Sequence, residues 1–132
     1  DGFFAYRGLD GYWGDPGRAA FLLRRGSSLA GFALVNAWSA SGAPTDHAVA
    51  EFFVLRKHRR VGFGAEAAEA LIGSRPGRWE VAVADYNEPA KAFWPKALAP
   101  FAPVERVEGD GDRWRGPIFR LTAGSAEARA QF

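Results

Sequence analysis

The chain has 132 residues, of which 48% are hydrophobic and 24% charged, with a net charge of +2 and no cysteine. This length suits one domain with a single core, and this composition excludes a disordered chain. No apolar run approaches the roughly 18 residues that a membrane-spanning helix needs, and the lack of cysteine excludes disulfides, thiolate zinc sites and thiol nucleophiles. We expect a single domain over residues 1–132, in the cytoplasm and without a membrane partner.

The first predicted elements are a hairpin and a buried strand. Apolar runs at residues 20–24 and 29–36 flank a short polar turn at residues 25–28, which is typical of two antiparallel strands. After a loop rich in glycine, proline and serine, the valine and phenylalanine content of Ala48 to Leu55 predicts the strongest strand. The basic segment Arg56 to Arg60 ends it abruptly.

A helix and a further strand are predicted next. Residues 65–72 are rich in alanine and glutamate and keep apolar positions at helical spacing, so they favour a helix. Trp79, Val81 and Val83 then alternate with smaller or polar residues, which is typical of a strand that ends near Asp85. The chain thus alternates strand, helix and strand around the basic segment.

The last predicted elements are a second helix and a C-terminal hairpin. Asn87 can cap a helix that begins at Glu88 and that Pro100 closes. Residues 104–108 and 113–121 flank a glycine- and aspartate-rich turn, which predicts two paired strands. The sequence therefore predicts an α/β (α+β) domain, in which helices flank a mixed, mostly antiparallel central sheet.

Residues Arg59 to Gly64 lie between the buried strand and the first helix. The first N–H groups of a helix have no acceptor within it, and the helix dipole adds partial positive charge, so this position forms an anion site. Gly62 and Gly64 let a phosphate approach the backbone, and Arg59 and Arg60 add full charges. The segment lacks the later glycine of the dinucleotide fingerprint and the ending of the nucleotide-triphosphate loop. It suits a pyrophosphate.

This segment resembles the pyrophosphate loop of the GNAT acetyltransferase family, whose pattern Arg/Gln-x-x-Gly-x-Gly/Ala matches Arg59, Gly62 and Gly64 in register. A second segment, at residues 87–94, is similar to the family's pattern Asn-x-x-Ala-x-x-Phe-Tyr and follows the loop at the family's spacing. Two motifs in order are far more specific than one. The resemblance covers about residues 21–119.

The resemblance implies a GNAT-like acyl-CoA N-acyltransferase fold and an enzyme that transfers an acetyl group from acetyl-CoA to an amine of a small molecule or peptide. The coenzyme-binding residues that it implies lie in the central strand, the loop and the second segment: Phe53, Val54, Leu55, Arg59, Arg60, Val61, Gly62, Phe63, Gly64, Ala65, Asn87, Ala90 and Phe93. The candidate catalytic residues are Glu51 and Trp94. No metal is expected, and a homodimer stays open.

The sequence departs from the family's pattern in two places. The family usually opens with a strand and a helix before the matched region, and this chain has no obvious room for them, so we expect a fold without them. Trp94 stands where many members carry a tyrosine that protonates the leaving coenzyme A thiolate, and an indole N–H is a far weaker acid than a phenol. Both departures favour a second hypothesis, a non-catalytic acyl-CoA-binding or sensor domain.

Glu51 is the candidate general base. An acid within an otherwise apolar strand is costly unless it faces a cleft, although strand alternation also allows it to face solvent or an arginine. When an amine attacks a thioester directly, the protein deprotonates the ammonium and polarises the carbonyl. We expect a main-chain N–H at the end of the same strand, from Phe53 or Leu55, to polarise the carbonyl.

Other residues keep alternative interpretations. The basic segment from Arg56 also suits a third hypothesis, a nucleic-acid module, but the adjoining phosphate site favours a coenzyme. His47 and His58 are expected at exposed ends of strands or turns. Aromatic residues that line an acceptor pocket or pack in the core are Tyr12, Trp13, Trp38 and Trp114.

Overall fold

The computed structural model describes residues 17–59 and 61–124. Its strands are β1 (Ala19–Arg25), β2 (Ser28–Asn36), β3 (His47–Val54), β4 (Gly77–Ala82), β5 (Glu105–Glu108) and β6 (Pro117–Ala123). Its α-helices are α1 (Phe63–Gly73) and α2 (Glu88–Ala97), and short 3-10 turns span Arg56–His58 and Ala99–Phe101. Every strand and helix predicted from residue 20 onward is present. The expected lack of an opening strand and helix concerns residues outside the described ranges.

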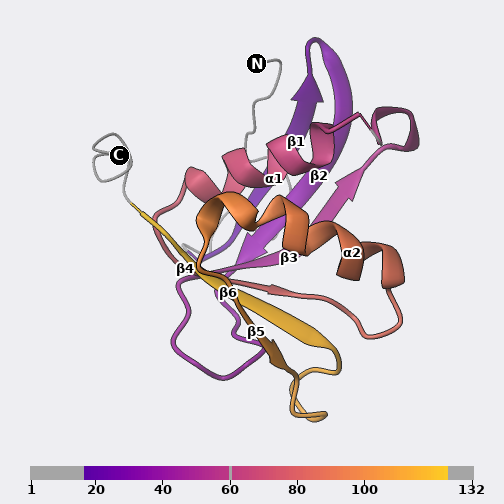
Figure 1. The fold of residues 1–132 in the computed structure, drawn as a ribbon. Helices are drawn as coiled ribbons and strands as arrows, with labels where there is room; N and C mark the ends of the chain where they lie inside the picture. Colours follow the sequence, from indigo (N-terminus) through magenta and orange to yellow (C-terminus); the bar gives the residue numbers. More distant parts are fainter. Residues whose placement is uncertain (1–16, 60, 125–132) are drawn as a thin grey trace.

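The described strands form one sheet in the order β1-β2-β3-β4-β6-β5. Its β3–β4 pair is parallel, and all its other pairs are antiparallel. The prediction of a mixed, mostly antiparallel sheet is therefore confirmed. Figure 1 shows α1 and α2 side by side on one face of this sheet. No helix in the described ranges is long and apolar enough to span a membrane.

The main core lies between the two helices and the centre of the sheet. Leu71 and Ile72 of α1 and Trp94 of α2 pack with Trp79 and Val81 of β4, and all five side chains are buried. Burial of each such side chain stabilises the fold by roughly 1.5–3 kcal/mol. The alternation that predicted β4 thus identifies the face of the sheet that the helices cover.

The centre of the sheet opens where β3 and β4 separate. The pairing of β2 with β3 shifts by one residue, because Leu34 lies opposite Glu51 and Val35 opposite Val49, which leaves Ala50 as a bulge. The parallel pairing of β3 with β4 covers His47 to Val49 and stops at this bulge. Beyond it, no described strand pairs with the β4-facing edge of β3, while β4 stays paired with β6.

Candidate functional site

The N-terminus of α1 forms an open anion site. Gly62 caps this helix with a left-handed backbone conformation (φ 83°), and no side chain in the described part of the chain caps the first turn. The N–H groups of Gly64 and Ala65 fall in that turn, where an α-helix supplies no acceptor. A Cβ added at Gly62 would meet no atom within 4 Å, so the space beside its Cα is open. The helix dipole favours an anion there.

Gly64 packs closely against α2 and the end of β3. A Cβ at this position would lie 3.2 Å from a ring carbon of Phe93 and 3.8 Å from a methyl group of Val54. Its Cα therefore faces α2 and the end of β3. The glycine lets α1 approach both elements closely, and this contact places the helix N-terminus beside the last residues of β3.

Arg59 folds back over the end of β3. Its Nε donates a hydrogen bond of 2.7 Å to the backbone oxygen of Val54, and its guanidinium carbon lies 5.4 Å from the centre of the Phe53 ring. Its two terminal nitrogens have no protein acceptor among the described residues and can still donate to a phosphate. Val61 is exposed and Phe63 is buried. Arg60 lies outside the described residues.

The backbone donors at the open edge of β3 are those of Phe52 and Val54. The N–H of Leu55 donates to the oxygen of Ala30 at 2.6 Å. Because donors alternate between the two edges of a strand, the N–H of Phe53, two residues earlier and opposite Phe32, also points toward β2. The prediction of Leu55 and Phe53 as thioester donors is therefore wrong by one residue.

Glu51 faces away from the helices. The adjacent Phe52 packs on the helix face, with its ring centre 6.0 Å from that of Phe93 and 5.3 Å from that of Trp94. Successive side chains of a strand point to opposite faces, so the Glu51 side chain lies on the other one. It is exposed, and its carboxylate has no hydrogen bond or ion pair with the described residues. It is thus free to meet a substrate.

A cavity of about 180 Å³ lies on the same face as Glu51. It adjoins the separation of β3 from β4, because Ala48, Ala50 and Ala82 line it. Its walls include the indoles of Trp38 and Trp114, so the expected aromatic wall is present for these two residues. Tyr12 and Trp13 lie outside the described residues.

Trp94 is a packing residue in this structure. Only 6% of its surface is exposed, and its indole contacts Phe52 and Phe93 edge to face. Ala90 and Phe93 pack against the same core. Contacts from Phe93 and Trp94 hold the Phe52 side chain on the helix face of the sheet, beside the open edge of β3.

Asn87 caps α2, as predicted: its Oδ1 accepts a hydrogen bond of 3.2 Å from the N–H of Ala90. Its exposed amide group remains able to donate to a coenzyme. Asn87→Asp keeps the capping oxygen and removes the amide donor, so we expect unchanged thermal stability and about tenfold weaker coenzyme A binding by calorimetry. Asn87→Ala should lower both quantities. If Asn87→Asp binds coenzyme A like the wild type, the residue is a cap alone.

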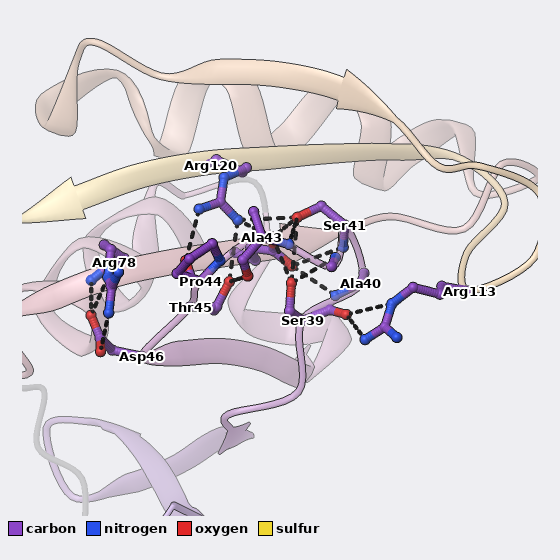
Figure 2. A network of polar contacts seen from close by, with 12 residues as sticks. Ser39, Ala40, Ser41, Ala43, Pro44, Thr45, Asp46, Arg78, Arg113 and Arg120 are labelled. Carbon is purple, nitrogen blue, oxygen red and sulfur yellow. Dashed lines mark hydrogen bonds and ion pairs between the residues drawn. The ribbon is translucent and has the colours of Figure 1, made fainter.

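A buried ionic network, missed by the sequence reasoning, anchors the loop before β3. Glu80 is fully buried and accepts hydrogen bonds from the N–H of Ala40 (2.7 Å) and the hydroxyl of Ser39 (3.2 Å), and from Ser41 and Arg120 (Figure 2). Burial raises the pKa of Glu80, but the hydrogen bonds from Ser41, Ala40 and Ser39 outweigh it and hold the pKa below its ordinary value. Both oxygens of the charged carboxylate thus accept hydrogen bonds from the loop or from Arg120, and Glu80 has a structural role.

The alternation of β4 places Glu80 on the face opposite to Trp79 and Val81. From the sequence alone, a glutamate on that face is predicted to be exposed to solvent. No local signal indicates that a loop 40 residues earlier covers this face. His58 is a second departure from expectation, because it is 7% exposed and both its ring nitrogens are buried without a hydrogen-bond partner among residues 17–59 and 61–124. The prediction of an exposed His58 is wrong.

Comparisons with known proteins agree with this geometry. The sequence matches the model of the acetyltransferase (GNAT) family over residues 2–99. No curated protein matches it. Among solved structures, an acetyltransferase from Thermus thermophilus superposes with a TM-score of 0.63 at 22% identity, over 83% of this chain and 66% of that one. The chain thus spans just under two thirds of that relative's length.

Two further structures share the fold. A GNAT family acetyltransferase from Elizabethkingia anophelis with acetyl-CoA bound has a TM-score of 0.57 at 10% identity, over 94% of this chain and 99% of that one. The ribosomal-protein-S18-alanine N-acetyltransferase from Escherichia coli has a TM-score of 0.53 at 21% identity, over 85% of this chain and 73% of that one. At these identities the likeness concerns the fold alone. Because the family model covers most of the chain, the protein belongs to the GNAT acetyltransferase family.

Proposed function

We propose that the protein is an N-acetyltransferase that transfers an acetyl group from acetyl-CoA to an amine. The observation that carries this proposal is the continuity of two sites: the open edge of β3 leads to the N-terminus of α1, whose first turn has no side-chain cap among the described residues. The contact of Gly64 with Val54 and Phe93 holds them together. A molecule that joins an extended amide-containing arm to a pyrophosphate, as acetyl-CoA does, matches both sites. The bound acetyl-CoA of the Elizabethkingia relative supports this choice.

The chemistry is a direct transfer. Glu51 takes a proton from the acceptor ammonium, and the amine nitrogen then attacks the thioester carbonyl carbon. The new C–N bond forms, the C–S bond breaks, and coenzyme A leaves as a thiolate, which takes up the second proton that the nitrogen loses as the amide forms. The N–H of Phe52 stabilises the negative charge that develops on the carbonyl oxygen. Trp94 protonates nothing in this scheme, because an indole N–H is too weak an acid.

Glu51→Gln should lower kcat about 100-fold, at the low end of what a positioned general base contributes. Affinity for coenzyme A, measured by calorimetry, should stay within about twofold, because the side chain faces away from the helix N-terminus and is replaced by one of equal size. Raising the pH should partly restore the rate, since a larger share of the acceptor is then already neutral. Full activity of the variant across pH would remove Glu51 from the mechanism.

The decisive experiment combines coenzyme A calorimetry with a turnover assay on a panel of amines. Binding together with turnover supports the transferase. The burial of Trp94 at the position of the family tyrosine favours one alternative, an acyl-CoA-binding or sensor domain, which would bind coenzyme A and acetylate no amine. Absence of binding would contradict both proposals.

A further inference from the structure

The cavity beside the bulge of β3 lies within reach of the thioester. Its lining includes Ala50, and the donor at the open edge is Phe52, two residues further along the strand. At a rise of about 3.3 Å per residue, these positions are about 7 Å apart. Glu51 lies between them and faces the same side as the cavity. Glu51 does not line the cavity itself, but it is the next residue after Ala50, so an amine that extends from the cavity along β3 approaches the proposed base and the thioester.

The side walls of the cavity are two fixed indoles. The Nε1 of Trp114 donates to the backbone oxygen of Val83 at 3.0 Å. The guanidinium of Arg113 lies 5.2 Å from the ring centre of Trp38 and donates to the oxygen of Ser39 at 2.5 and 3.1 Å. Both rings are thus held by contacts from other segments. Arg113 covers one face of Trp38, and the aromatic surface that remains on the two rings suits a flat or apolar body and attracts a cation.

The sheet on one side and the loop that begins at Ser39 on another limit the size of the cavity. Small side chains of β3 and β4, those of Ala48, Ala50 and Ala82, line the sheet side. The loop that begins at Ser39 is fixed by the Glu80 network, as Figure 2 shows, so this boundary is rigid. The volume of about 180 Å³ is below the roughly 300–1,000 Å³ of sites for drug-sized ligands. An extended peptide instead requires a long groove with backbone partners.

We propose that this cavity is the acceptor site and that its substrates are small primary amines with a flat or apolar body, of the arylalkylamine type, selected by Trp38 and Trp114. The inference rests on the proposed function and deepens it. The body of the acceptor packs between the indoles, and its ammonium points toward Glu51 and the thioester. The charge of Glu80 does not select the amine, because Arg120 neutralises it.

The test measures initial rates with acetyl-CoA and four acceptors: phenethylamine, tryptamine, spermidine and a short peptide with a free N-terminus. We expect kcat/KM for the two arylalkylamines to exceed the other values at least tenfold. Trp38→Ala should raise the KM for phenethylamine about tenfold and leave kcat within about twofold, because the exposed indole binds the body of the substrate and not the reacting atoms. Trp38→Phe, which retains an aromatic face, should recover most of the affinity.

Coenzyme A calorimetry on the same variants separates this inference from the proposed function. If the wild type does not bind coenzyme A, both the acceptor assignment and the proposed function are overturned. Normal binding together with a preference for the peptide or spermidine, or an unchanged KM in Trp38→Ala, overturns the acceptor assignment alone. If no amine is acetylated, titration of phenethylamine into the coenzyme complex still decides. A saturable change of tryptophan fluorescence, with a Kd that Trp38→Ala raises, supports the site. No saturable change in the wild type, or an equal Kd in the variant, contradicts it.

Discussion

Gly62→Asp should weaken coenzyme A binding about 1000-fold. The glycine caps α1, and the space beside its Cα is open, so an aspartate side chain would enter the region that we propose for the pyrophosphate. Two like charges about 4 Å apart near a protein surface repel by roughly 4 kcal/mol. A loss of that size corresponds to about three orders of magnitude in Kd. Calorimetry with coenzyme A measures it without knowledge of the acceptor.

Two variants separate charge from backbone strain. Gly62→Ala imposes the same left-handed strain, of about 1–2 kcal/mol, without the charge. It should therefore change affinity only a few-fold. Gly111→Asp is the matched control, because Gly111 has almost the same backbone angle (φ 87° against 83°) and equally open surroundings, in the turn between β5 and β6. Equal coenzyme A affinity of Gly62→Asp and Gly111→Asp would disprove a pyrophosphate site at α1.

The order and type of the elements could be predicted because each carries a local signal. The alternation of Trp79, Val81 and Val83 specifies β4, and Asn87 caps α2 through its own side chain, as its position before a proline-containing first turn suggested. The single parallel pair follows from the long connection through α1 between β3 and β4. The alternation and the cap lie within a few residues, and the length of the connection can be counted along the chain, so a sequence reveals all three.

The predicted donors of β3 failed because strand pairing is not a local property. The direction of each N–H depends on which neighbour Leu55 pairs with, and the bulge at Ala50 changes the register of the strand. Val54 was named among the coenzyme-binding residues, whereas Phe52 was not. The bulge itself has no signal in the residue types around Glu51.

The buried charge of Glu80 and the burial of His58 escaped prediction for the same reason. The alternation of side chains along a strand predicts that Glu80 and Trp79 lie on opposite faces. Only the folded structure shows that Ser39 and Ser41 cover Glu80. The polar loop that reads as solvent-exposed spacer is in fact the partner of a carboxylate. The aromatic wall formed by Trp38 and Trp114 could be suggested from residue type alone, and its location required the structure.

Glu80→Ala should destabilise the fold by about 3–5 kcal/mol, the typical result of removing one partner from a buried ion pair. The change leaves the Arg120 guanidinium without its carboxylate and two backbone N–H groups of the loop, at Ala40 and Ser41, without an acceptor. A typical domain has only about 5–15 kcal/mol of stability. Denaturant unfolding at pH 7 measures the loss, and Glu80→Gln, which keeps one oxygen acceptor, should show a smaller one.

Asp46→Ala is the matched control, because Asp46 pairs with Arg78 at 2.9 Å in an exposed ion pair, with 40% and 52% of the two side chains accessible. Solvent screens such pairs, so the unfolding midpoint should barely move. An equal effect of the two substitutions would show that burial of Glu80 contributes nothing. Loss of stability in Glu80→Ala should also raise the KM for the acceptor, because the loop beside Trp38 loses its anchor.

The contribution of Glu80 should depend on pH in one direction. Its pKa in the folded protein lies below the ordinary value of 4.5 that it has in the unfolded chain. The unfolded chain therefore binds the proton more readily, and stability decreases as the pH falls below about 4.5 toward the folded-state pKa. The difference in unfolding free energy between wild type and Glu80→Gln should be constant from about pH 8 to 5 and shrink below about pH 4.5. A difference that grows on acidification would mean that the folded-state pKa lies above the ordinary value, so that burial outweighs the hydrogen bonds to the carboxylate.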